Sequence, residues 1–323
     1  MSRVQLANGR SFEVPPGVTL LEAAAHAGLA LPHSCRSGKC GSCKAQSNVA
    51  ARHLQGDDCL STVERAQGYV LTCTDTADSD LLLDLEDLAE LAALRTHTLP
   101  ARVHSMERPC PDVLVLRLRL PPHHGLRFLP GQYLNLIGPN GLRRAYSIAN
   151  ADAQSGLELH IRHLEGGAMS RVVFHELAVN ALLRIQAPLG SFHLGDVAGL
   201  HLVWLATGTG LAPFKAMLEA LQAAARSSWP KSIRFYWGNR TEADFYWQPP
   251  PTDLPLQFTP VCSRQADWPG ARGHVQDHAL AAELPDRVFA CGSAAMIESA
   301  RASFLDRGLN PRHFQSDAFV SSS

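Results

Sequence analysis

The pattern of apolar and polar positions divides the chain into three regions. Up to about residue 90, two short alternating runs, RVQLA and SFEV, precede a segment with apolar residues at helical spacing, Val18–Pro32. Later apolar runs lie at Gly68–Cys73 and Asp80–Leu85. Short strands mixed with one helix predict a small α+β domain. The following segment, Leu88–Pro100, is typical of a partly helical linker that ends at a proline.

The second and third regions have different patterns. From about residue 100 to 196, alternating runs such as VLVLRLRL are separated by turn residues, which predicts an antiparallel barrel. Beyond this point strand-like and helix-like segments alternate, beginning with LHLVWLA, PFKAMLEALQAAA and SIRFYWG. This alternation predicts a doubly wound parallel sheet. We therefore expect a multidomain protein: an α+β domain at 1–92, a β-barrel at 98–196 and an α/β domain at 197–323.

Composition and charge narrow the classes of function. The chain has 323 residues, enough for several domains, and a net charge of −1 gives no reason to expect nucleic acid or a membrane surface as a partner. No apolar run approaches the roughly 20 residues that cross a bilayer. The first apolar segment contains Glu22 and His26 and does not resemble a signal peptide. We expect a cytoplasmic protein, in which clustered cysteines bind metal or take part in catalysis rather than form disulfides.

Four cysteines have the spacing of an iron–sulfur site. Cys35, Cys40 and Cys43 follow a C-x4-C-x2-C pattern, and Cys73 is a fourth candidate ligand. This spacing is that of plant-type [2Fe–2S] proteins, in which four soft thiolates bind two irons. A structural zinc site is the alternative, but such sites usually pair two short C-x2-C segments. Here a single distant cysteine closes one long loop, which favours the cluster.

The composition of the loop supports this interpretation. Small side chains let the backbone wrap closely round a cluster and direct N–H groups at its sulfurs. The small residues are Ser37, Gly38, Gly41 and Ser42. For Cys59, Cys110 and Cys262, which lack such spacing, we expect buried packing.

A [2Fe–2S] cluster transfers one electron at a time, whereas a nicotinamide donates a hydride, which carries two. A flavin can connect the two kinds of transfer. The sequence RAYS, in the barrel region, offers three suitable residues: Arg144 for a phosphate, Tyr146 to stack beside the flavin ring and Ser147 to hydrogen-bond near its reactive edge. The alternative is that the R-x-Y-S pattern occurs by chance and that Tyr146 is an ordinary packing residue of a strand.

Three further motifs have the form of nucleotide sites. GGAMS (Gly166–Ser170) precedes a helix-like stretch, VVFHEL, and can present N–H groups to a pyrophosphate, although a turn with a helix cap explains it equally well. ATGTGLAP joins a strand to a helix, with Gly208 and Gly210 for close approach and Pro213 in the first helical turn. In FACGSAAMI, Cys291 ends a strand, where it is a ligand-site residue or a core cysteine.

The set of motifs is more specific than any one of them. In this order behind a ferredoxin loop, they resemble the ferredoxin–NADP reductase superfamily, in its class with an N-terminal [2Fe–2S] domain. The likeness extends over the whole chain and includes LRLPP, GQYLNL, RRAYSIANA, FYWG, ACGSAAMI and SDAFV (Ser316–Val320). It is strongest to the group of CDP-6-deoxy-3,4-glucoseen reductases, and it extends to the reductase components of ring-hydroxylating oxygenases.

The resemblance implies cofactor sites on matching residues. It implies FAD at Arg144, Tyr146, Ser147, Arg162, Gly167, Met169 and Ser170. It implies the pyridine nucleotide at Gly208, Thr209, Gly210 and Pro213, with Cys291 and Gly292 near the nicotinamide. Phe319 matches an aromatic residue beside the flavin, or is a surface residue in a frayed tail. Ser147 and Cys291 are the expected catalytic residues, and Ala145 replaces a serine that is common in relatives.

The choice of nucleotide is open from the sequence. Asn239 and Arg240 follow the second α/β strand, where selectivity for the adenosine ribose is usually set. An arginine there suits the 2′-phosphate of NADPH, whereas Glu242 or Asp244 suits the ribose hydroxyls of NADH. The resemblance favours NADH.

We therefore expect an NAD(P)H-dependent oxidoreductase in which electrons pass from NADH to FAD, to the [2Fe–2S] cluster and on to a separate redox protein. Two classes of partner compete: a dehydrase that acts on a CDP-sugar, and a terminal oxygenase that hydroxylates or demethylates an aromatic compound. A redox-sensing module without turnover is the alternative from a different class. Paired flavin and nicotinamide motifs in one chain favour the enzyme.

Overall fold

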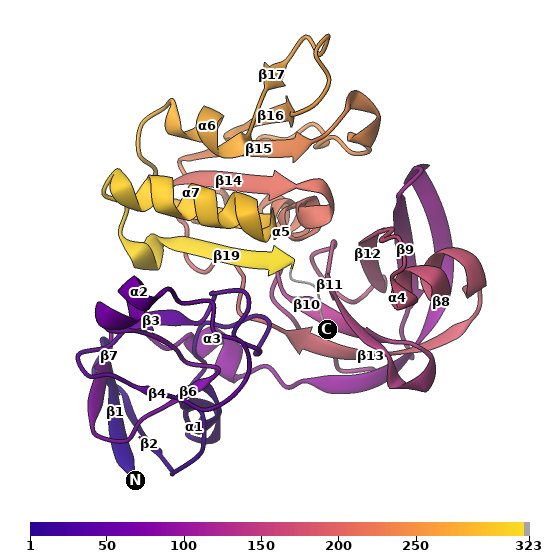
Figure 1. The fold of residues 1–323 in the computed structure, drawn as a ribbon. Coiled ribbons are helices and arrows are strands. Elements are labelled where there is room, and N and C mark those ends of the chain that lie inside the picture. Colours follow the sequence, from indigo (N-terminus) through magenta and orange to yellow (C-terminus); the bar gives the residue numbers. More distant parts are fainter. Residues whose placement is uncertain (320–323) are drawn as a thin grey trace. The chain divides into compact units, whose positions relative to one another are not determined.

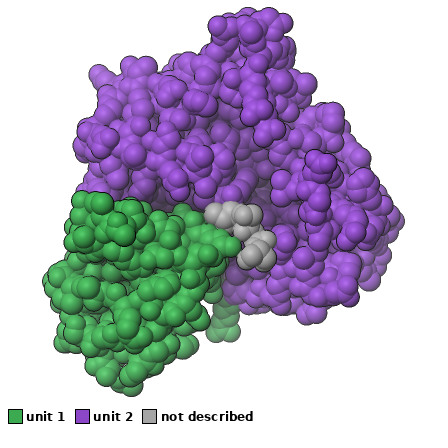
Figure 2. All heavy atoms as spheres, in the orientation of Figure 1, with its two compact units in different colours: residues 1–95, 190–192 green, residues 96–189, 193–323 purple. Residues whose placement is uncertain are grey.

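The computed structural model describes residues 1–319, so Val320 of the SDAFV motif lies outside the described residues. The chain forms two compact units, which Figure 2 shows in different colours: residues 1–95 with 190–192, and residues 96–189 with 193–323. Among the described residues, no helix combines the length and the apolar character needed to cross a membrane.

The first unit is a small α+β domain, as the sequence predicts (Figure 1). In its main sheet β1 pairs antiparallel with β2 and parallel with β7. The helix α1 begins at Leu20 because Thr19 and Glu22 form a capping box, and it buries Leu20 and Leu21. The elements are β1 (Ser2–Leu6), β2 (Ser11–Val14), α1 (Leu20–His26), β3 (Lys44–Gln46), β4 (Arg52–His53), α2 (Thr62–Ala66), β5 (Tyr69–Leu71), β6 (Asp75–Thr76), β7 (Leu81–Leu83) and α3 (Ala89–Ala92).

The second unit begins with the predicted antiparallel barrel. Its six strands have the order β11-β10-β13-β8-β9-β12. A bridge between Ile148, just after β11, and Leu159 of β12 brings the two edge strands together. The elements are β8 (His97–Cys110), β9 (Val113–Arg119), β10 (Tyr133–Ile137), η1 (Pro139–Gly141), β11 (Arg143–Ser147), β12 (Leu157–Arg162), α4 (Ala168–Arg171), η2 (Val172–Glu176) and β13 (Leu182–Leu189).

The linker predicted over Leu88–Pro100 is shorter than expected. Strand β8 begins at His97 and contains Pro100. At Pro100 the strand has β13 on one side, whereas the pairing with β9 begins only at Arg102. A proline, which has no N–H to donate, is tolerated where one side of a strand is unpaired.

The rest of the second unit is the predicted parallel α/β sheet, with strand order β17-β16-β15-β14-β18-β19. The chain moves outward from β14 in both directions, so the gap between β14 and β18 is the topological switch point, where open α/β sheets bind ligands. The elements are β14 (His201–Thr207), η3 (Gly208–Gly210), α5 (Leu211–Ala223), η4 (Arg226–Ser228), β15 (Ser232–Asn239), η5 (Glu242–Asp244), β16 (Leu256–Cys262), β17 (Ala271–Arg272), α6 (Val275–Leu280), β18 (Arg287–Ser293), α7 (Ala294–Asp306), η6 (Pro311–His313) and β19 (Phe314–Phe319).

Candidate functional site

The four predicted cluster ligands lie in two pairs. The Cys43 thiol donates a hydrogen bond to Cys73 Sγ at 3.2 Å. The Cys40 thiol bonds to Cys35 and lowers the pKa of Cys35 to about 4, while its own pKa is raised. Two pairs of soft thiols, each pair ready to bind one iron, form a donor set that fits a two-iron cluster.

The loop glycines have the conformations that the sequence suggests. Gly38 has a φ of +80°, and a Cβ atom there would lie 1.6 Å from the carbonyl oxygen of Asp57, so no other residue fits. The thiol of Cys43 and, more weakly, the N–H of Gly38 lower the pKa of Cys73. The N–H of Ser37 donates to Cys35 Sγ at 3.4 Å. The backbone therefore directs donors at the sulfurs.

The other cysteines differ from one another. Cys110 and Cys262 are buried, as expected, but Cys59 is exposed, so the prediction of buried packing was wrong for that residue. Cys59 ends an exposed stretch of loop, residues 55–59, and its Sγ lies 3.7 Å from the Cβ position of Gly41. The Cys262 thiol donates to the carbonyl oxygen of Arg240 at 3.1 Å.

The residues of the RAYS motif end the barrel strand β11. Arg144 is partly exposed and donates to the carbonyl oxygen of Arg143. Burial raises the pKa of Tyr146 to about 12, so its phenol is neutral. Ser147 is 5% exposed, and its Oγ has no hydrogen-bond partner among the described residues. A buried hydroxyl without a partner is costly, and a flavin with ring nitrogen and carbonyl groups would satisfy it.

The GGAMS segment forms the single helical turn α4, and Gly167 precedes its first residue. Ser170 is buried, and its Oγ accepts a hydrogen bond from the N–H of Leu164 at 2.9 Å, which closes the loop. Met169 is 2% exposed and packs in the barrel core against Gly138. Any contact of Met169 with FAD would therefore involve its backbone. The helix continues as the π-helical turn η2, so it starts earlier than VVFHEL predicts.

Arg162 lies at the end of β12, where the barrel meets the α/β sheet. Its Nε donates to Asp112 at 2.7 Å, and its Nη2 lies 3.8 Å from Asp244. A Cβ atom on Gly208 would come within 2.9 Å of Arg162 Nη1. The structure thus places this cation next to the GTG turn as well as on the barrel.

The GTG turn and the Cys291–Gly292 turn pack backbone to backbone at the switch point. Gly208 has a φ of +54°, and Trp237 Nε1 donates to its carbonyl oxygen at 2.8 Å. A Cβ atom on Gly210 would lie 2.3 Å from the carbonyl oxygen of Cys291. A Cβ atom on Gly292 would lie 2.1 Å from Thr207 Oγ1. The remaining predicted residues of the turn, Thr209 and Pro213, are buried.

Ser147 and Cys291 come from different domains, and the structure brings them together. Cys291 is fully buried, and burial followed by the charge of Asp317 raises the pKa of its thiol well above the usual value. The Ser147 hydroxyl offsets part of this rise, so it lies near the thiol, although the two groups do not form a hydrogen bond of regular geometry. The expected flavin and nicotinamide sites therefore meet at one point.

Asp317 belongs to this site and was not predicted. It is buried, and it lies opposite Cys291 in the parallel pairing of β18 with β19. The sequence signal for it was its place in the SDAFV motif, two residues before Phe319. Phe319 itself ends β19 opposite Ser293 and is 44% exposed, so its ring is accessible.

The predicted ribose-selectivity residues lie at the end of β15. Asn239 is buried, and its Nδ2 has no partner among the described residues, which fits a nucleotide at this edge. Arg240 is exposed. Asp244 forms a capping box with Thr241, and Glu242 is exposed beside it. The structure thus leaves both Arg240 and Glu242 accessible to a ribose.

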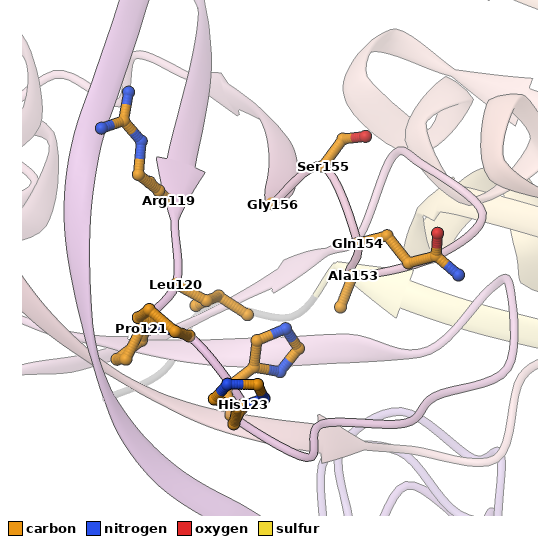
Figure 3. Close-up of a pocket in the computed structure, with 10 residues that line it drawn as sticks. Arg119, Leu120, Pro121, His123, Ala153, Gln154, Ser155 and Gly156 are labelled. Atoms are coloured by element: carbon orange, nitrogen blue, oxygen red, sulfur yellow. The ribbon is translucent and has the colours of Figure 1, made fainter.

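A separate cavity of 410 Å³ lies on the barrel and contains none of the predicted site residues. Figure 3 shows Arg119–His123 on one side of it and Ala153–Gly156 on the other. It is a surface depression next to the hairpin that precedes β12.

Comparisons with known proteins agree with this arrangement. Residues 5–77 match the family profile of the 2Fe-2S iron-sulfur cluster binding domain. Residues 100–194 match the oxidoreductase FAD-binding domain, and residues 204–302 match the oxidoreductase NAD-binding domain. Three cofactor-binding domains therefore follow one another in the predicted order.

Two named relatives match this chain over nearly the whole length of both proteins. The CDP-6-deoxy-L-threo-D-glycero-4-hexulose-3-dehydrase reductase of Yersinia pseudotuberculosis is 38% identical over 94% of this chain and 94% of its own. Reductase component 2 of the terephthalate 1,2-dioxygenase of a Comamonas species is 32% identical over 96% of this chain and 94% of its own.

Among solved structures, an Amycolatopsis cytochrome P450 reductase is 30% identical, with a TM-score of 0.72 and complete coverage of both chains. The predicted fold class and the three cofactors, a [2Fe–2S] cluster, FAD and a nicotinamide nucleotide, are thereby confirmed. The chain belongs to the ferredoxin–NADP reductase superfamily, in the group of NAD(P)H-dependent iron–sulfur flavoprotein reductases that carry an N-terminal [2Fe–2S] domain.

Proposed function

We propose that this reductase takes electrons from NADH and delivers them to a separate dehydrase that acts on a CDP-sugar. The observation that supports the reductase part of this proposal is the meeting of Ser147 and Cys291 at the switch point of the second unit. Hydride transfer requires the donor and acceptor rings to lie in contact, and these two side chains come from the expected sites of the two rings.

The proposed binding residues follow the motifs. Cys35, Cys40, Cys43 and Cys73 would hold the cluster, and Arg144, Tyr146, Ser147 and the Gly167–Ser170 turn would hold FAD. The nucleotide would lie over Gly208–Gly210 and Pro213, with Asn239 and Arg240 at its ribose and Cys291 and Gly292 at its nicotinamide. Bound FAD would supply the chemistry that converts a two-electron hydride into single electrons for the cluster. The domain boundaries at 1–92, 98–196 and 197–323 and a cytoplasmic location belong to the same proposal.

The protein's own side chains position and tune these groups. Ser147 would donate a hydrogen bond at the flavin edge, and Arg144 would neutralise phosphate charge. The buried, protonated thiol of Cys291 would itself add no negative charge beside the nicotinamide. No protein acid or base is required for the transfer of a hydride.

The choice of partner is supported by the Yersinia relative, whose name describes it as the reductase of a hexulose dehydrase, and which is 38% identical to this chain. The second candidate is a terminal oxygenase. It is supported by the Comamonas relative, a component of a terephthalate dioxygenase, at 32% identity.

Reconstitution tests the choice. The purified protein, loaded with both cofactors, is mixed with a CDP-sugar dehydrase and its substrate, or with an aromatic oxygenase and its substrate, and product is measured. We expect NADH-driven turnover of the CDP-sugar only when dehydrase and reductase are both present. Turnover of the aromatic compound with no turnover of the CDP-sugar would assign the oxygenase instead.

A simpler assay addresses turnover itself. The protein alone should reduce cytochrome c continuously with NADH, and with a lower KM for NADH than for NADPH. Complete inactivity of the fully loaded protein would favour a redox-sensing module. A lower KM for NADPH than for NADH would overturn the proposed choice of nucleotide.

A further inference from the structure

A group of charged side chains is buried where the barrel meets the α/β sheet. Its centre is Glu158 of β12, which is 9% exposed. The Glu158 carboxylate accepts hydrogen bonds from Arg117 Nε and from His160 Nε2, each at 2.9 Å, and lies 3.2 Å from Lys215 Nζ. Arg117, Glu158 and His160 belong to the barrel, whereas Lys215 belongs to α5 of the α/β sheet. Cationic side chains from both domains, Arg117 and Lys215, therefore contact the carboxylate of Glu158.

The protonation of the central groups follows from their partners. Burial lowers the pKa of His160, so the ring is neutral. Because a carboxylate can only accept, His160 Nε2 carries the proton, and Nδ1 is left as an acceptor. Nδ1 lies 3.0 Å from the hydroxyl of Tyr246, which must therefore donate to it. This chain of bonds connects Glu158 to the loop that follows β15.

The second arm of the group reaches the flavin strand. Lys215 Nζ donates to the carbonyl oxygen of Ala149 at 3.2 Å and to Glu219 Oε1 at 2.5 Å. Glu219 Oε2 in turn accepts from the N–H of Ala151 at 3.0 Å. Ala149 is only two residues after Ser147, and Lys215 is five residues after Gly210 of the nucleotide turn. Both ends of the connection therefore lie next to the expected site of hydride transfer.

We propose that Lys215 and Glu158 are positioning residues for hydride transfer. Together with His160 and Glu219 they form a polar clasp, which holds the segment after Ser147 against α5 and so sets Ser147 opposite Cys291. Burying the Glu158 carboxylate and the Lys215 ammonium group is costly, and apolar side chains would join two domains at least as firmly. A charged clasp with directional bonds fixes the register between the domains, which apolar packing would not. This inference rests on the proposed use of Ser147 and Cys291 in hydride transfer.

The rate of flavin reduction tests the clasp. Lys215→Met and Glu158→Gln are compared with the unchanged protein and with Lys231→Met, the same substitution at an exposed lysine. Under anaerobic conditions and at saturating NADH, we expect flavin reduction to slow by about tenfold or more in the two clasp variants, because a small misplacement of reacting groups is enough. FAD content, cluster absorbance and the Lys231→Met rate should be unchanged.

Four further measurements separate positioning from general loss of structure. Lys215→Arg should restore most of the rate, because it keeps the positive charge. The double variant should be no slower than the slower single variant, since both break one clasp. Amide hydrogen exchange at Ala151 should be faster in Lys215→Met and Glu158→Gln than in Lys231→Met. Glu219→Gln, at a more exposed position, should cause a smaller decrease in rate.

The inference is wrong if the clasp variants reduce flavin at the unchanged rate, or if their rates fall only in proportion to lost FAD. If the unchanged protein itself fails to reduce flavin with NADH, the proposed function fails instead. In that case the exchange of the Ala151 amide still reports whether the clasp holds the segment.

Discussion

Cys35 and Cys40 form the more exposed of the two thiol pairs, and Cys43 and Cys73 form the buried one. We predict that Cys40→Ser removes the iron and the cluster absorbance, because a neutral hydroxyl is a poor ligand for iron in place of a thiolate. Reduction of FAD by NADH should persist, since the residues expected to bind FAD and NADH lie in the second unit. Iron analysis and absorption spectra with NADH check both outcomes. Cys59→Ser, an exposed thiol outside the pairs, is the control and should retain its iron.

Gly38 and Gly41 provide a second test at the residue scale. Both have positive φ, +80° and +70°, so an alanine at either position is strained by roughly 1 kcal/mol. Only at Gly38 does the new Cβ collide with backbone, 1.6 Å from Asp57 O, while at Gly41 the nearest atom is 3.7 Å away. Gly38→Ala should therefore lose the cluster and Gly41→Ala should keep most of it. Equal cluster content in the two purified variants would contradict this account of the loop.

The sequence reveals these residues to different degrees. The cluster ligands can be predicted because three of them lie within nine residues of one loop, so their spacing alone limits the geometry. Asp317 could not be predicted in the same way. It is 26 residues beyond Cys291, and only the parallel pairing of β18 with β19 brings the two together. Cys59 was misassigned because a lone cysteine gives no signal of whether its loop is covered.

At the scale of elements, the two turns at the switch point depend on glycine. Gly292 has a φ of +137°, and its missing Cβ leaves room for Thr207 Oγ1, which accepts a hydrogen bond from the N–H of Ser293 at 3.0 Å. The end of β14 and the end of β18 are thereby joined where the nicotinamide would lie. The ends of β14 and β18 can therefore approach closely only because the turn after Cys291 has a glycine.

We predict that Gly292→Ala impairs NADH binding more than it impairs FAD binding. The new Cβ would displace Thr207 and open the β14 and β18 turns, whereas β11 is unaffected. The KM for NADH should rise at least tenfold with FAD content preserved. Gly308→Ala is a matched control, because Gly308 also has positive φ but nothing lies within 4 Å of its Cβ position. An unchanged KM in Gly292→Ala would show that the turn tolerates a side chain.

Most elements follow from local pattern, and the exceptions have physical causes. Period-two alternation identifies β9 and β12, although the structure buries both faces of these strands, and helical spacing identifies α1 and α5. Pro100 was taken as the end of a linker, since proline usually ends regular structure. It lies instead within β8, at a point where only one neighbouring strand is present. Which side of a strand is unpaired is a property of the sheet and cannot be seen in one segment.

At the scale of the whole molecule, Glu158 makes the stability of the second unit depend on pH. Burial alone would raise the pKa of Glu158, but the hydrogen bond from His160 and the charge of Lys215 together lower it to about 2. A carboxyl whose pKa is lowered on folding stabilises the protein above its unfolded pKa. That contribution, at most roughly 3 kcal/mol, is lost as the pH falls from about 4.5 to about 2.

We therefore predict that Glu158→Gln lowers stability at pH 7 and makes it less dependent on pH below 4.5. Urea unfolding followed by tryptophan fluorescence is suitable, because all five tryptophans lie in the second unit. The difference between the variant and the unchanged protein should shrink as the pH falls from 4.5 toward 2. Glu298→Gln, at an exposed glutamate of α7, should follow the unchanged protein at every pH. A constant difference between Glu158→Gln and the unchanged protein would contradict the assignment.

The sequence indicates the three domains but not how they are joined. In the sequence, Glu158 is one polar residue of a strand and Lys215 is one polar residue of a helix, and neither position indicates a partner in another domain. Their pairing exists only when the two domains dock, so no pattern within either segment predicts it. The same holds for Ser147 and Cys291, which only a family resemblance could connect before the fold was known.

Residues 190–192 belong to the first unit although they follow the last barrel strand. Ser191 donates from its N–H and its hydroxyl to the carbonyl oxygen of His33, and its Oγ accepts from the N–H of His33. His33 is two residues before Cys35. A ferredoxin module excised at residue 95 would lack this support, and a module transplanted from another reductase would need a matching acceptor and donor at that point. Replacement of the ferredoxin module of this chain is thus constrained by residues 190–192, which a domain boundary at residue 95 would leave in the other part.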